Sequence, residues 1–130
     1  MPDGITGADA AVGQFLWVAL HEVGHATFDI IDVPIFGSAE DAADNFATYI
    51  VLQFSKNQPR RLIVGAAWAW RAYSLAAFAS DHGLPQERYY NLLCLAIVTQ
   101  REVFADLEVY LPRPRSPHCV FECQRLVPCL

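Results

Sequence analysis

Proline and glycine divide this chain into apolar segments of helical length, and this spacing limits the available folds more than any other feature. Apolar residues recur at helical intervals, and no segment shows the sustained apolar–polar alternation of a half-buried strand. Ser38 is the predicted N-cap of one segment, with Asp41 in the capping position. We therefore predict a mostly α-helical fold. The predicted helices cover residues 9–28 or slightly beyond, 39–54, 62–80 and 85–110, with a turn at 55–61.

Length and composition fit one domain over residues 1–130, ending in an irregular Cys- and Pro-rich tail at 111–130 with at most one short helix. Hydrophobic residues make up 54% and charged residues 18%, which supports a buried core and excludes a disordered chain. The formal net charge of −5 argues against nucleic-acid binding, which depends on Lys and Arg neutralising phosphates.

Neither a membrane span nor a signal peptide is indicated. The run 62–80 approaches the length of a span, but Arg71 at its centre would cost roughly 2.5–3.5 kcal/mol on insertion, and its small residues suit packing in a helical core. Asp3 and Asp9 stand where a signal peptide would carry basic residues. Either the protein is cytoplasmic or a leader lies outside this sequence.

Four cysteines, Cys94, Cys119, Cys123 and Cys129, allow two disulfides in three pairings. Buried free thiols and a small metal site that uses His118 are the alternatives. The spacing of the last three cysteines differs from the two-residue gaps that are usual in zinc sites.

The segment His21–His25 has the sequence HEVGH. On a helix, residues four apart share a face, so the two imidazoles would occupy two corners of a zinc tetrahedron. Glu22 would accept the proton of a metal-bound water, and Gly24 would leave room beside the metal. The alternative is a core helix whose histidines are satisfied by ordinary hydrogen bonds. A third ligand on a neighbouring helix would favour the metal site.

Glu40 and Asp44 are also four residues apart, in the next predicted helix. In an antiparallel helix pair, four residues forward along one helix correspond to four residues back along the other. If Glu40 faces His25, Asp44 would therefore face His21. Glu40 would then be the third zinc ligand, and Asp44 would accept the hydrogen bond of the non-ligating nitrogen of His21. A solvated acidic first turn, favoured by the helix dipole, is the alternative.

This arrangement requires the first helix to end within about a turn of His25, because a helix rises about 1.5 Å per residue. The residues DIIDVPIFG would then form a looping connection. If the helix were longer, Asp44 would become the ligand and Glu40 a bystander.

The motif HExxH followed by E-x3-D resembles the active-site helices of the gluzincins, the thermolysin-like metallopeptidases. The stretch HEVGHATFDIIDVPIFGSAEDAADNFAT, with the blocks DHGLPQERYYNLLC and HCVFECQRL, is similar to a bacterial family described as metallopeptidases. Together these blocks span most of residues 15–127.

The resemblance implies zinc held by His21, His25 and Glu40, with Glu22 as catalytic base. It also implies a Cys94–Cys119 disulfide, in proteins that are often exported to the periplasm or secreted. Arg88, Tyr89 and Asn91 match recurring residues without an assigned role. His82 is either a transition-state donor or a loop histidine.

Zincins usually place a β-sheet before the HExxH helix, and its edge strand binds extended substrate. Only 20 residues precede His21 here, without a strand signal, so the sheet is expected to be absent or truncated. The first hypothesis is a zinc metalloendopeptidase acting on a peptide or protein substrate. The second is a non-catalytic, zinc-stabilised helical module, or peptidase remnant, that binds a partner through apolar surface.

Overall fold

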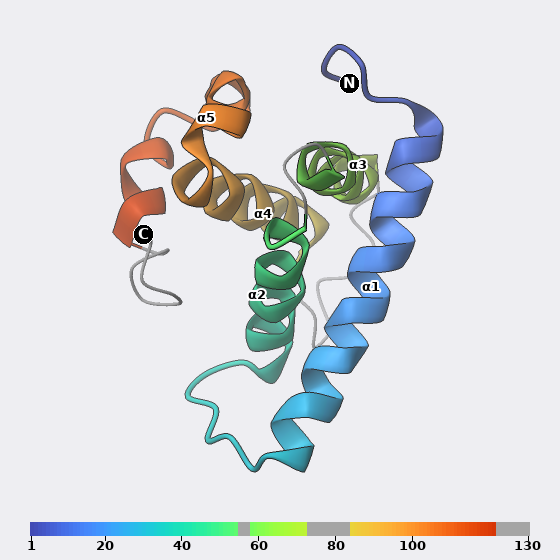
Figure 1. Ribbon diagram of the computed structural model, residues 1–130. Helices are drawn as coiled ribbons and strands as arrows, with labels where there is room; N and C mark the ends of the chain where they lie inside the picture. Colours follow the sequence, from blue (N-terminus) through green and yellow to red (C-terminus); the bar gives the residue numbers. More distant parts are fainter. Residues whose placement is uncertain (55–57, 73–83, 122–130) are drawn as a thin grey trace.

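The computed structural model describes residues 1–54, 58–72 and 84–121 of the chain. No strand occurs in these three ranges, and the prediction of a mostly helical fold is confirmed (Figure 1). The elements are α1 (Gly7–Ile30), α2 (Ala39–Leu52), α3 (Gln58–Ala72), α4 (Pro85–Thr99), α5 (Arg101–Phe104), η1 (Ala105–Tyr110) and η2 (Ser116–His118).

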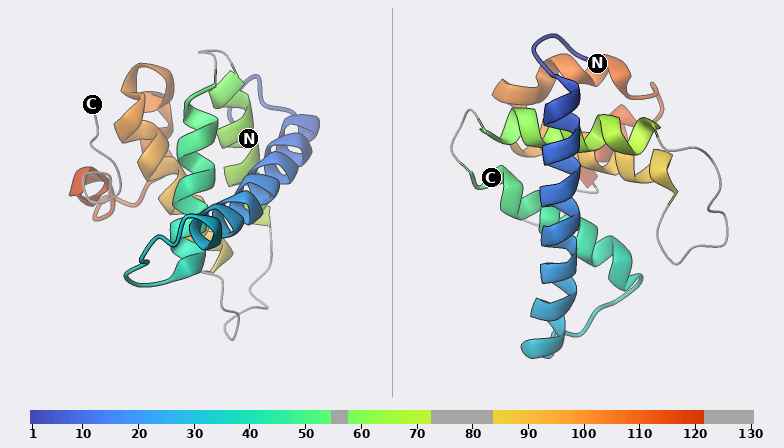
Figure 2. Two further views of the ribbon diagram at one scale, coloured as in Figure 1. Left: turned by 60° about the horizontal axis from the view of Figure 1, so that its bottom comes forward. Right: turned by 90° about the vertical axis from the view of Figure 1, so that its right-hand side faces the viewer.

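The longest helix, α1, lies across the outside of the others, beside α3 in its first half and beside α2 in its second half (Figures 1 and 2). Thr6 starts it through a capping box: Thr6 Oγ1 accepts from the Asp9 amide, and the Asp9 carboxylate accepts from the Thr6 amide at 2.8 Å. The helix therefore begins two residues before the predicted start. Its buried residues form one stripe, Gly13, Trp17, His21 and Gly24.

Glycines allow the backbones of α1 and α3 to touch. A Cβ atom on Gly65 would lie 2.6 Å from the carbonyl carbon of Asp9, and one on Gly13 would lie 2.9 Å from the amide nitrogen of Ala66. Gly24 has a similar role toward α2, because its Cβ would lie 3.3 Å from the Cα of Ala43. The space left by Gly24 is thus filled by α2, and the expectation that it leaves room beside a metal is wrong.

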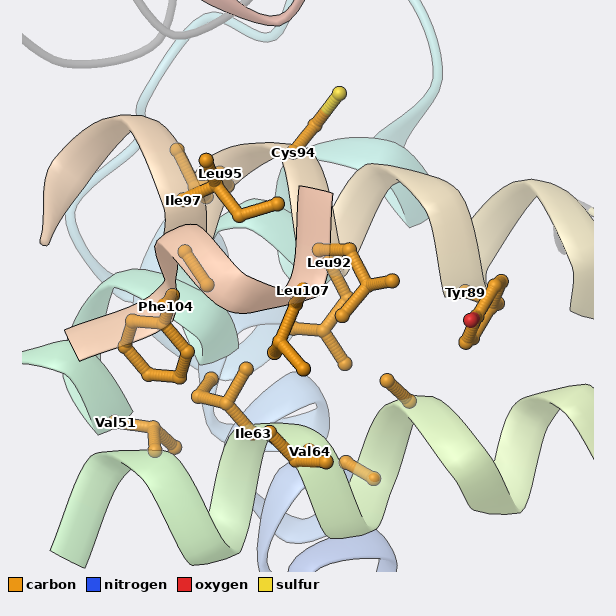
Figure 3. Close-up of a cluster of buried hydrophobic side chains, with 14 of the residues drawn as sticks. Val51, Ile63, Val64, Tyr89, Leu92, Cys94, Leu95, Ile97, Phe104 and Leu107 are labelled. Atoms are coloured by element: carbon orange, nitrogen blue, oxygen red, sulfur yellow. The ribbon is translucent and has the colours of Figure 1, made fainter. Parts of the chain in front are cut away.

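The hydrophobic core lies where α3 and α4 face each other and is closed by residues of α2, α5 and η1 (Figure 3). Its largest fully buried side chains include Trp17, Phe104, Ile63, Leu93 and Leu107. Burial of such side chains stabilises the fold by roughly 1.5–3 kcal/mol each relative to exposure. The core thus fixes α4 against the α1–α2 pair.

Two predicted boundaries are wrong. Helix α3 starts at Gln58, inside the predicted turn at 55–61. Pro59 is compatible with this start, because the N–H groups of the first helical turn have no partner within the helix and proline lacks only that group. The helix expected over 85–110 breaks at Gln100, which has φ −134° and ψ 65°. Its side chain donates to the carbonyl of Leu52 at 2.5 Å and so satisfies the end of α2.

Ser38 caps α2 as predicted, since its Oγ accepts from the Asp41 amide at 3.3 Å. Only the first part of the apolar run 62–80 is described, as α3. Within the described ranges, the helices are too short or too polar to cross a membrane.

A disulfide joins Cys94 of α4 to Cys119, with the two Cα atoms 5.0 Å apart. Both cysteines are buried. This is the pairing that the family resemblance implied, and it fixes the region around η2 to α4. In the described part of the tail, residues 111–115 are irregular and η2 continues into helical residues 119–121, which agrees with the prediction of an irregular tail with at most one short helix. Cys123, Cys129 and His82 lie outside the described residues.

Candidate metal centre

Two antiparallel helices bring the predicted ligands together. His21 and His25 lie one turn apart on α1, and Glu40 is the second residue of α2. The first helix ends at Ile30, which agrees with the predicted end just beyond residue 28 but lies five residues after His25, slightly more than the one turn that the predicted site required. Glu40 still reaches both imidazoles because the connection turns back sharply, with positive φ at Asp32 (51°) and Gly37 (104°).

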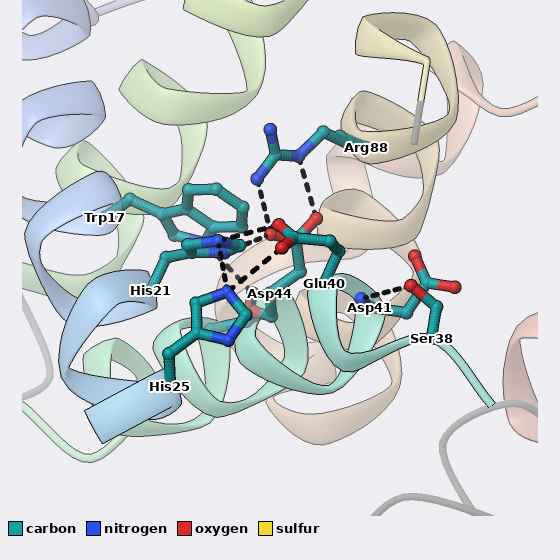
Figure 4. A network of polar contacts seen from close by, with 9 residues as sticks. Trp17, His21, His25, Ser38, Glu40, Asp41, Asp44 and Arg88 are labelled. Carbon is teal, nitrogen blue, oxygen red and sulfur yellow. Dashed lines mark hydrogen bonds and ion pairs between the residues drawn. The ribbon is translucent and has the colours of Figure 1, made fainter. Parts of the chain in front are cut away.

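The three side chains form a small triangle of nitrogen and oxygen atoms (Figure 4). His21 Nε2 lies 3.1 Å from His25 Nε2 and 3.1 Å from Glu40 Oε2. His25 Nε2 lies 3.3 Å from Glu40 Oε1. The side chain of His21 is 3% exposed, whereas those of Glu40 and His25 are 22% and 30% exposed. The triangle is therefore closed on the His21 side and accessible to solvent on the other.

The two imidazole nitrogens face different oxygens of the Glu40 carboxylate. If both nitrogens carry protons, each donates to its own oxygen, and the two N–H groups then lie side by side with their nitrogens 3.1 Å apart. If both nitrogens are unprotonated, two lone pairs and a carboxylate converge, which is the donor set that binds a cation.

The dimensions fit a tetrahedral zinc ion. Zinc binds imidazole nitrogen at about 2.0–2.1 Å and carboxylate oxygen at about 2.0–2.2 Å, which gives ligand-to-ligand edges of about 3.3 Å. The two imidazole nitrogens, 3.1 Å apart, are close to this separation, and each lies 3.1–3.3 Å from a different oxygen of Glu40. Two histidines and one carboxylate are also the ligand set of many catalytic zinc sites, which leave a fourth position open.

Asp44 lies level with His21, one turn along α2 from Glu40. Its Oδ1 accepts from His21 Nδ1 at 2.7 Å. This contact holds the proton on Nδ1 and leaves the lone pair of Nε2 in the triangle. The pairing of His21 with Asp44 and of His25 with Glu40 is the helix register expected from the sequence. Glu40 in addition contacts His21.

Two further residues complete the site, and the sequence did not reveal their roles. Arg88 of α4 donates to both oxygens of Asp44, from Nε at 2.8 Å and from Nη2 at 2.5 Å. Trp17 packs 5.9 Å from the His21 ring and donates from Nε1 to Thr48 Oγ1 at 3.1 Å. The available sequence signal for Arg88 was an arginine in a largely apolar helical segment. The signal for Trp17 was its helical position, one turn before His21.

The remaining acidic residues lie at the edge of the network. Glu22 follows His21 on α1 and is exposed, so water reaches its carboxylate. Burial raises the pKa of Asp41, and the neighbouring Asp44 carboxylate raises it further. The structure thus places His21, His25, Glu40 and Asp44 in one network, whereas Glu22 is exposed on α1.

Comparison with known proteins assigns the chain to a family. No curated protein and no solved structure matches the chain. A family model described as "Putative metallopeptidase" matches residues 3–128, which is nearly the whole sequence. This description agrees with a triangle of two histidines and a glutamate able to hold a metal ion. The chain therefore belongs to this metallopeptidase family, DUF4344.

Proposed function

We propose that the protein is a zinc-dependent metalloendopeptidase of gluzincin type. His21, His25 and Glu40 would hold the metal. The observation that carries this proposal is the convergence of two imidazole nitrogens and one carboxylate, the ligand set of many catalytic zinc sites, with one ligand atom of each residue within 4.8 Å of the others. The family match supports it independently.

When bound, zinc would polarise the scissile carbonyl and lower the pKa of water to near 7. The other roles belong to the chain. Glu22, exposed beside His21, would accept a proton from the attacking water and return it to the leaving amine. Asp44 would keep His21 in the tautomer that directs Nε2 toward the metal.

A first experiment measures metal content. Purified protein should contain about one zinc per chain, and His21→Ala should lose it. Zinc should also raise the melting temperature, by mass action. A metal-free preparation that stays folded and does not take up added zinc would contradict the proposal.

A second experiment separates metal binding from catalysis. Glu22→Gln should retain zinc and lose peptide cleavage, because the amide no longer accepts a proton. Glu102→Gln, on the exposed surface of α5, is the matched control and should cleave like the wild type. Cleavage that persists in Glu22→Gln would rule out Glu22 as the general base.

The second candidate is a zinc-stabilised module that binds a protein partner without cleaving it. Two observations favour it. The described ranges contain no strand that would bind substrate by strand addition. Large apolar side chains are exposed, notably Phe15 at 76% and Phe36 at 96%. Stoichiometric zinc without cleavage of a broad peptide library would favour this candidate.

A further inference from the structure

Arg88 is a buried cation in an aromatic environment. The residue is only 7% exposed. Its guanidinium carbon lies 4.0 Å from the ring centre of Trp70. It lies 4.9 Å from the ring centre of Trp17, which Figure 4 shows beside it. Cation–π contacts of this kind compensate part of the lost hydration and restrict the guanidinium to one position.

The guanidinium binds Asp44 in a bidentate manner. Nε and Nη2 donate to different carboxylate oxygens, at 2.8 and 2.5 Å. A terminal carboxylate otherwise rotates easily about its last torsion, whereas two parallel hydrogen bonds fix its plane. The same Oδ1 that accepts from Arg88 also accepts from His21 Nδ1 at 2.7 Å. The orientation of the arginine is thus transmitted to the imidazole.

Stability alone is a weak explanation for this ion pair. A buried pair is often no more stabilising than apolar side chains of similar volume, because both charges lose their hydration. The specific effect of the ion pair is on the orientation of Asp44. The pair fixes the plane of the carboxylate, and Oδ1 therefore lies at one position from which it accepts the Nδ1 proton of His21. Nε2 is then held with its lone pair toward His25 and Glu40.

We propose that Arg88, held between Trp17 and Trp70, is a positioning residue for the metal centre that acts through Asp44 on His21. This inference rests on the proposed zinc site. Without the arginine, Asp44 would rotate and His21 would populate the other tautomer. The fraction of chains ready to bind metal would fall, and zinc affinity with it.

The test is a double-mutant cycle on the full-length chain, with zinc affinity measured by competition against a chromogenic chelator. Arg88→Met and Asp44→Asn should each weaken zinc binding by roughly 10–100-fold. The double variant should bind zinc about as weakly as Asp44→Asn, because Arg88 acts only through Asp44. Independent losses that multiply in the double variant would overturn the proposal.

Arg60→Met is the matched control. Arg60 also makes a bidentate ion pair, to Asp106 at 2.8 and 2.6 Å, but in a region away from the histidines. Its loss should lower stability and leave zinc affinity unchanged. Imidazole ¹⁵N spectra give a second measurement: the wild type should show His21 protonated on Nδ1, and Arg88→Met should show a mixture of tautomers. A single unchanged tautomer in Arg88→Met would overturn the proposal.

If Arg88→Met does not fold, Arg88→Lys carries the test. Lysine keeps the charge but lacks the two-pronged donor, so zinc affinity should fall several-fold. Wild-type affinity in Arg88→Lys would overturn the proposal. Failure of the zinc site itself gives a different result, because the wild type would then bind no zinc at all.

Discussion

The contact between α1 and α3 makes Gly65→Ala a sharp test of the fold. The added Cβ would lie 2.6 Å from the Asp9 carbonyl carbon, whereas ordinary contact begins at 3.4 Å. Its neighbours are backbone atoms of the first turn of α1, which the Thr6 cap holds in place. The two helices must therefore separate or rotate.

The magnitude follows from two opposing effects. Overpacking of a close-packed site costs typically about 1–3 kcal/mol, and backbone neighbours place this site at the upper end. Alanine gains about 1 kcal/mol in helix propensity over glycine. The net result is destabilisation by about 1–2 kcal/mol, or a fall in melting temperature of about 5 °C for a chain of this size.

Urea unfolding, followed by circular dichroism, measures the free energy of unfolding of both proteins. Gly7→Ala is the matched control, because no atom lies within 4 Å of its Cβ position. It should be neutral or stabilising by up to about 1 kcal/mol. A Gly65→Ala protein as stable as Gly7→Ala would refute the helix contact described here.

Two further perturbations test the outer part of the fold. The hydrogen bond from Arg60 lowers the pKa of Asp106, so this carboxylate contributes stability above its unfolded pKa and loses it as pH falls through the lowered folded pKa. Asp106→Asn should therefore reduce the free energy of unfolding by about 0.5–1 kcal/mol at pH 7, and the difference should be smaller at about pH 3, below the ordinary aspartate pKa of 3.8, in urea titrations at both pH values; an equal difference at pH 3 would contradict this reasoning. Replacing Cys94 and Cys119 by alanine should cost about 3–4 kcal/mol, because the disulfide closes a loop of 25 residues. A loss below about 1 kcal/mol in the same assay would show that the bond constrains the unfolded chain little.

The paired helices of the site were predictable from sequence because their spacing is local. His21, His25, Glu40 and Asp44 lie within two consecutive helices, and helical periodicity shows that each pair shares one face of its helix. The Ser38 cap was visible for the same reason. Local rules of this kind depend on residues a few positions apart.

Contacts from distant segments were not predictable in this way. Arg88 meets Asp44 across 44 residues, and Gly65 meets Asp9 only because α3 crosses α1. The break at Gln100 likewise depends on the carbonyl of Leu52, 48 residues away. Periodicity shows which face of a helix is apolar, but the partner of that face depends on how the helices pack.

The buried stripe of α1 serves the core and the metal centre together. Gly13, Trp17 and His21 occupy it at intervals of four residues. A one-residue insertion between Gly13 and His21 would rotate everything that follows by about 100°, turning both histidines away from α2 even though every ligand was still encoded. The exposed connection 31–38 would absorb the same insertion without changing either helix. Among natural variants of this chain, length changes between Gly13 and Asp44 should therefore fall in that connection and not in α1.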